Sequence, residues 1–247
     1  MIGLHILAHS IQMILRNLWH VLQLGLVPLI ALLVGVGSLS IAIAKSGVAG
    51  GGGIGPMLFL IFFCVMFPAI WFAVNWHRFI LLEEYPRGFF PPVPKGEMWR
   101  YFGYSFLIGF LVLLMAIPLM MLTFGALAAA GSANFFSFQG MIEFGAILLF
   151  TAVAMRLGLI LPAVSIGEKS ALGAMWGKTS GHSGAIFTLA FCIAVIGQAF
   201  EYLPSVLPTG LLSVSFIVVS QLFLVVLNIS ILTSLYGHYV EGRPVTG

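Results

Sequence analysis

Long stretches without charge constrain this chain more than any other feature. Five runs lack Asp, Glu, Lys and Arg, at residues 17–44, 46–77, 101–142, 179–200 and 202–240. A helix needs about 20 apolar residues to cross the hydrocarbon core of a bilayer. The runs therefore predict six transmembrane helices, near residues 18–43, 56–82, 101–129, 139–166, 183–203 and 210–237. The fourth carries Glu143 and Arg156, so its limits are the least defined.

The composition agrees with a membrane protein. Hydrophobic residues make up 61% of the 247 residues and charged residues 7%, against roughly 45–50% and about 25% in soluble domains. Mean hydropathy is +1.14. These values exclude a soluble enzyme, a nucleic-acid-binding protein and a disordered chain. We expect an all-α, polytopic helical bundle that forms one integral membrane domain over residues 1–247.

Two segments outside the spans have the pattern of interfacial helices. In residues 2–16, polar side chains recur every three or four residues, at His5, His9, Gln12 and Arg16, among apolar neighbours. This pattern predicts an amphipathic helix at the membrane boundary. A second is expected at Ser170–Ser180. Within the spans we expect prolines to kink the helices rather than break them, at Pro28, Pro68, Pro118 and Pro162.

The basic residues predict the orientation. Eight lie on one side of the predicted spans, namely Arg16, Arg78, Arg87, Lys95, Arg100, Lys169, Lys178 and Arg243. Lys45 lies on the other side. Cytoplasmic loops carry the excess of Lys and Arg, so both termini are predicted to be cytoplasmic.

The tryptophans suggest an internal repeat. Trp19, Trp99 and Trp176 are 80 and 77 residues apart, and each precedes a pair of predicted spans beside a basic residue. Three copies of an interfacial helix followed by a membrane hairpin would produce this spacing. The alternative is that Trp and Arg favour membrane interfaces in any protein.

Arg156 is the most informative single residue because a charge inside a span costs roughly 2.5–3.5 kcal/mol. Its partner could be Glu168, Asn228 or a lipid phosphate, or its side chain could extend to the headgroups without a specific partner. A site for lipid headgroups or a protein partner would combine it with Arg78, Trp176 and Lys178.

The other polar residues do not indicate a catalytic or metal site. Four amides inside the spans are expected to hydrogen-bond between helices, at Asn75, Gln198, Gln221 and Asn228. The six histidines fall near the predicted cytoplasmic edge, where we expect polar interfacial side chains. His5 and His9 are one helical turn apart but have no neighbouring Cys or carboxylate, so no metal site and no cofactor are expected. No catalytic constellation is found, and the chain is predicted not to be an enzyme.

Two segments resemble a known group of proteins. Asn75–Gly88 (NWHRFILLEEYPRG) and Arg156–Phe187 (RLGLILPAVSIGEKSALGAMWGKTSGHSGAIF) are similar to those of uncharacterised bacterial inner-membrane proteins. These proteins resemble the membrane domain that precedes some glycerophosphodiester phosphodiesterases. The resemblance implies six helices and a bacterial inner membrane. It does not imply the phosphodiesterase reaction, which belongs to a separate barrel domain.

Two classes of function follow from these patterns. The first is a non-enzymatic inner-membrane protein that engages lipid headgroups, among them anionic phospholipids, or serves as an accessory or assembly subunit of a larger membrane complex. Nucleic acid is not an expected partner. The alternative is a transporter or channel for small solutes, favoured by the repeat, the prolines and the polar residues inside the spans. Few charges are available in the spans to bind or couple ions.

Overall fold

The computed structural model describes residues 2–46, 54–88, 90–92, 94–130, 138–208 and 210–244. Regular structure in these ranges is helical. The helices are α1 (Ile2–Arg16), α2 (Leu18–Ser46), α3 (Ile54–Leu82), α4 (Lys95–Ala130), α5 (Phe138–Gly158), α6 (Ile160–Ser165), α7 (Leu172–Thr179), the 3₁₀ turn η1 (Ser180–His182), α8 (Ser183–Val206) and α9 (Leu211–Tyr239).

Six helical segments in the described ranges are long and apolar enough to cross a membrane. They are Leu18–Ile41, Leu58–Leu82, Lys95–Met121, Gly140–Ser165, Leu172–Val206 and Leu212–Tyr239. These segments confirm the prediction of an all-α helical bundle with six spans. The protein is therefore a multi-pass membrane protein.

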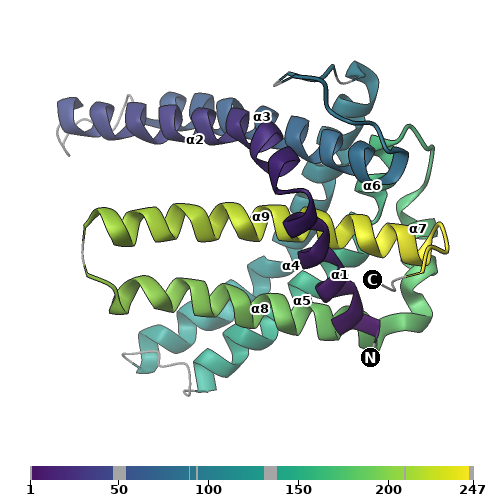
Figure 1. Ribbon diagram of the computed structural model, residues 1–247. Helices are drawn as coiled ribbons and strands as arrows, with labels where there is room; N and C mark the ends of the chain where they lie inside the picture. Colours follow the sequence, from purple (N-terminus) through teal and green to yellow (C-terminus); the bar gives the residue numbers. More distant parts are fainter. Residues whose placement is uncertain are drawn as a thin grey trace.

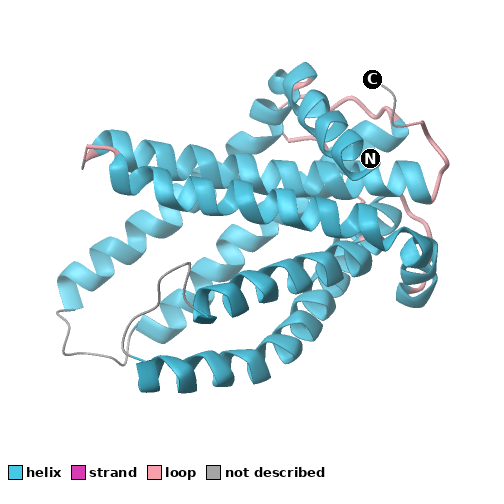
Figure 2. Ribbon diagram, turned by 90° about the horizontal axis from the view of Figure 1, so that it is seen from below, coloured by secondary structure: helices cyan, strands magenta, loops and turns pink. Residues whose placement is uncertain are grey.

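The long helices form three hairpins, α2 with α3, α4 with α5, and α8 with α9 (Figure 1). The hairpin ends all lie on one side, opposite the two ends of the chain, and the hairpins spread apart in that direction (Figures 1 and 2). We call the joined part the hub, residues 2–25, 70–110, 152–194 and 223–244. The remaining described parts of the hairpins are called the arms.

The fourth predicted span, 139–166, is not one continuous helix. It is interrupted at Leu159, which separates α5 from α6. Pro162 has no backbone N–H to donate to the carbonyl of Gly158, and its ring crowds that carbonyl. Pro28, Pro68 and Pro118, in contrast, lie inside continuous helices, as predicted.

Both segments that were predicted to be interfacial are helical, as α1 and α7, while their place at a membrane interface stays a prediction. The buried face of α1 consists of Gly3, Ile6, Ser10 and Ile14, a spacing of three and four residues that packs against α8 and α9. The approach to α8 is close, because a Cβ built on Gly3 would lie 2.7 Å from the backbone oxygen of Ala185. The amphipathic pattern therefore docks α1 across the hub.

The hairpins agree in part with the proposed repeat. Helix α1 precedes the first hairpin and α7 the third, but the described residues between α3 and α4 contain no helix. The three tryptophans Trp19, Trp99 and Trp176 are all exposed in the hub. Three successive hairpins are thus present, whereas their origin as a sequence repeat stays a prediction.

Candidate functional site

Charge is concentrated on the hub. It carries nine of the ten basic residues and five of the seven acidic residues. The exceptions are Lys45, Glu143 and Glu201, on the arms. The hub therefore has an excess of positive charge and is the part of the molecule suited to anionic partners.

Arg78 is bound within the protein. Its Nε and Nη2 donate to the two carboxylate oxygens of Glu84, at 2.8 and 2.7 Å, and its Nη1 donates to the carbonyl of Ser165 at 3.0 Å. The chain reverses after α3 because Glu83 adopts a left-handed conformation (φ 56°), which returns Glu84 to the helix end. Arg78 thus ties α3 to α6 with its charge matched by a carboxylate.

Arg156, in the last turn of α5, has a different environment. Its Nη2 donates to Ser183 Oγ at 2.6 Å, and its guanidinium carbon lies 5.0 Å from the ring centroid of Trp176. It forms no ion pair with any carboxylate in the described ranges. A cation near a helix C-terminus and over an indole ring is favourable, but its charge is left without a counter-charge from those parts of the chain.

The two protein partners considered for Arg156 bind elsewhere. The carboxylate of Glu168 accepts a hydrogen bond from the hydroxyl of Tyr236 at 2.7 Å. The amide of Asn228 donates to the carbonyl of Leu224, one turn earlier in its own helix. Glu168 reaches α9 because the chain turns away after α6, so neither residue neutralises Arg156.

Trp176 contacts Arg156, and Lys178 follows two residues later on the same short helix, on a different face. Both are exposed on α7, and Trp176 holds the guanidinium through its ring. We call Arg156, Trp176 and Ser183 the Arg156 cluster. Of the four residues that the sequence suggested for one site, the structure brings Arg156 and Trp176 into contact, Lys178 lies nearby on α7, and Arg78 has its own partners.

The amide side chains inside the spans were expected to hydrogen-bond between helices, but the two whose hydrogen bonds are seen bond within their own helix. Asn75 donates to Trp71 O and Asn228 to Leu224 O, both four residues earlier in the same helix. A short amide side chain can reach that carbonyl without a second helix. Gln198 is half-buried and Gln221 exposed, both on the arms, and for them the role between helices stays a prediction.

Further polar contacts between helices are made by residues that the sequence did not single out. His77 Nδ1 is 2.8 Å from Thr233 Oγ1, and its Nε2 is 3.3 Å from the hydroxyl of Tyr101. Thr233 donates to Ile229 O, so it accepts from His77 Nδ1–H, and His77 Nε2 then accepts from Tyr101. His77 is fully buried, which corrects its assignment as an interfacial side chain.

A regular pattern on α9 could have indicated these contacts. Ser230, Thr233 and Ser234 are spaced as one face of a helix within an otherwise apolar span, and all three are buried. Ser234 meets Ser10 of α1, with the two Oγ atoms 2.9 Å apart. A stripe of hydroxyls in a membrane helix predicts contact with other polar helix faces.

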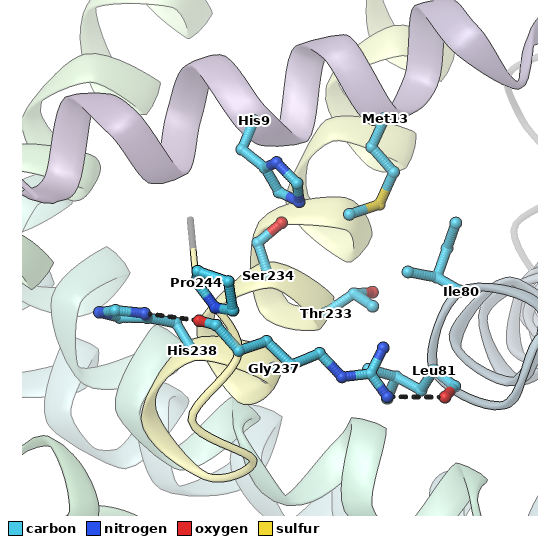
Figure 3. Close-up of a pocket in the computed structure, with 10 residues that line it drawn as sticks. His9, Met13, Ile80, Leu81, Thr233, Ser234, Gly237, His238 and Pro244 are labelled. Carbon is cyan, nitrogen blue, oxygen red and sulfur yellow. Dashed lines mark hydrogen bonds between the residues drawn. The ribbon is translucent and has the colours of Figure 1, made fainter. Parts of the chain in front are cut away.

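A small cavity lies beside this stripe (Figure 3). Its volume is about 60 Å³, and it is lined by His9, Met13, Ile80, Leu81, Thr233, Ser234, Gly237, His238, Arg243 and Pro244. The lining residues come from α1, α3, α9 and the C-terminal segment. The cavity is therefore built where four separate parts of the hub meet.

Comparison of the chain with protein-family models, curated proteins and solved structures finds no match. The similarity of Asn75–Gly88 and Arg156–Phe187 to bacterial inner-membrane proteins thus stays a prediction.

Proposed function

We propose that this membrane protein binds the headgroups of anionic phospholipids at its hub, through the Arg156 cluster, and that it does so without catalysing a reaction. The hub would lie at the cytoplasmic side of a bacterial inner membrane, with the arms extending from it toward the opposite side. The observation that carries the proposal is the guanidinium of Arg156, which is held in place but has no ion-pair partner in the described ranges.

The chemistry of the cluster suits a phosphate diester. A guanidinium binds phosphate oxygens through charge-assisted hydrogen bonds, and one contact to Ser183 leaves further N–H groups of Arg156 available. Lys178 adds a second cation on the adjacent helix. An exposed tryptophan is the side chain that membrane interfaces favour, so Trp176 is suited to the headgroup level.

The contrast between Arg78 and Arg156 strengthens this choice. Both arginines lie toward the hub end of a span, yet only Arg78 has a carboxylate within hydrogen-bonding distance. A lipid phosphate supplies the missing counter-charge for Arg156 at that depth.

The test is retention of lipid by the purified protein. The full chain would be reconstituted in nanodiscs of phosphatidylcholine and phosphatidylglycerol, and the lipids that remain bound after release would be identified by native mass spectrometry. We expect the wild type to retain phosphatidylglycerol and Arg156→Gln to retain about tenfold less, the effect of losing a charge-assisted hydrogen bond.

Arg87→Gln is the matched control, because Arg87 is exposed on the same hub outside the cluster. It should retain the lipid as the wild type does. Equal retention by Arg156→Gln and the wild type would refute the site. A stoichiometric protein that copurifies from native membranes in place of lipid would instead indicate an accessory subunit.

A further inference from the structure

The cavity of Figure 3 is lined on one side by the C-terminal segment of the chain, through Arg243 and Pro244. After α9 the backbone reverses at Gly242 (φ 72°), and the N–H of Arg243 donates to Gly237 O at 2.8 Å. Nη2 of Arg243 donates to Leu81 O at the end of α3, at 2.8 Å. These bonds hold the guanidinium against the cavity and leave its Nη1 available.

Two histidines provide further polar groups in the lining of the cavity. His9 points from α1 toward Ser234 (Figure 3), and His238 lies on the other side with its Nδ1 3.0 Å from the carbonyl of Arg243. His238 therefore directs Nδ1–H to that carbonyl and keeps Nε2 available. In the neutral ring this Nε2 is an acceptor, so the groups that can donate to an anion in this cavity are Nη1 of Arg243 and the ring N–H of His9.

Ser234 contributes an acceptor. The hydroxyl of Ser10 donates to Ile6 O at 2.8 Å, so in the Ser10–Ser234 pair the proton comes from Ser234. Ser234 Oγ then has lone pairs left to accept a hydrogen bond. A ligand that matches this lining is an anion that also carries one O–H group.

The surroundings are positive on balance. Arg243 pairs with Glu241 through Nε, while Arg16, on α1, acts on His9. Burial, first, and the charge of Arg16, second, lower the pKa of His9 from its ordinary value. The charge of Arg16 makes a second positive charge on His9 unfavourable, and an entering anion would offset that repulsion.

We propose that this cavity binds a phosphate group that retains a proton, as in inorganic phosphate or a phosphate monoester. The volume agrees, since about 60 Å³ corresponds to roughly four water positions and phosphate has four oxygens. Arg243 and His9 donate to the charged oxygens, and Ser234 or Nε2 of His238 accepts from the protonated one. This site is separate from the Arg156 cluster, and it stands or falls independently of lipid retention there.

The first experiment uses inorganic phosphate. The full-length protein in phosphatidylcholine nanodiscs is titrated with phosphate at constant ionic strength, and binding is followed by calorimetry and by the shift in thermal unfolding. We expect saturable binding by the wild type. His9→Gln and Arg243→Gln should each weaken it about tenfold or more, the loss of one charge-assisted contact.

Two further variants separate binding from folding. His5→Gln is the matched control, because His5 is exposed one turn before His9 and is not part of the cavity lining. It should bind as the wild type does. Gly237→Ala keeps every charge but adds a methyl group 3.5 Å from Arg243 Cδ. It should weaken binding by occupying the cavity, even if Arg243→Gln releases the C-terminal segment.

A second arm distinguishes the two sources of phosphate. Nanodiscs that contain phosphatidic acid, a lipid phosphate monoester, should abolish the response to inorganic phosphate if the lipid is the ligand. Phosphatidylglycerol, a diester, should not. Binding of either inorganic phosphate or phosphatidic acid that depends on His9 and Arg243 supports the proposal. No saturable binding, or binding unchanged in His9→Gln, Arg243→Gln and Gly237→Ala, overturns it.

Discussion

The hub and the arms of this protein consist of similar apolar helices, but they differ in how far their large side chains are buried. In the hub, large side chains such as Trp76, Leu235 and Tyr236 are fully buried. In the arms, side chains of the same type remain on the surface, among them Phe59, Leu113 and Val219. In the described ranges, the buried hydrophobic side chains all belong to the hub. The six spans therefore share one core at one end only.

The difference follows from the solvent that each region meets. Lipid tails are as apolar as leucine, so the arms gain little from packing against one another and depend on hydrogen bonds within each helix. The hub combines apolar burial with polar contacts between helices, such as His77 to Thr233. We infer that the hub fixes the tertiary structure, while the bilayer supports the arms.

The orientation test has the largest expected effect, because its outcome is all-or-none. In a background without Cys64 and Cys192, Gly173→Cys places a thiol on the exposed surface of the hub and Ser205→Cys places one at the end of an arm. With a membrane-impermeant maleimide on spheroplasts, we expect only the arm cysteine to react, since basic residues favour the cytoplasm. The hub cysteine should react after lysis. The reverse pattern would show that the hub faces outward.

Truncation of one leucine in each region compares the two cores. Leu235→Ala removes a fully buried side chain from the hub, whereas Leu113→Ala shortens a side chain that is 53% exposed on an arm. We expect Leu235→Ala to lower the free energy of unfolding by about 2–5 kcal/mol. Leu113→Ala should have an effect within about 0.5 kcal/mol, measured by denaturant unfolding in bicelles. Similar losses at both positions would contradict the division between hub and arms.

Substitution of one glycine in each region should change stability less, but in opposite directions. In Gly3→Ala, the added methyl group would lie 2.7 Å from Ala185 O, where α1 meets α8. The resulting displacement should cost about 1–3 kcal/mol. Gly145→Ala, on an arm, adds a methyl group where no other atom lies within 4 Å. Since alanine favours helix over glycine, that change should be neutral or stabilising by up to about 1 kcal/mol. Destabilisation by Gly145→Ala would mean that the arms pack more tightly than the structure indicates.

The candidate site was predictable in part. The sequence pointed to Arg156 because a charged residue inside a span is costly, and to Trp176 because tryptophan favours membrane interfaces. Partners were not predictable. Arg78 and Glu84 are close only because Glu83 turns the chain back, and Glu168 meets Tyr236 only because α6 directs it to α9.

The sequence by itself determined the number of spans and the helical nature of α1 and α7. Each of these is a local property, set by the length of an apolar run or by the spacing of polar residues along one helix. Tertiary structure alone decided that His77 is buried, that Arg156 lacks an ion-pair partner in the described ranges, and that a cavity forms between α1, α3, α9 and the C-terminal segment. These features depend on how helices distant in sequence are rotated and crossed, which no local pattern specifies.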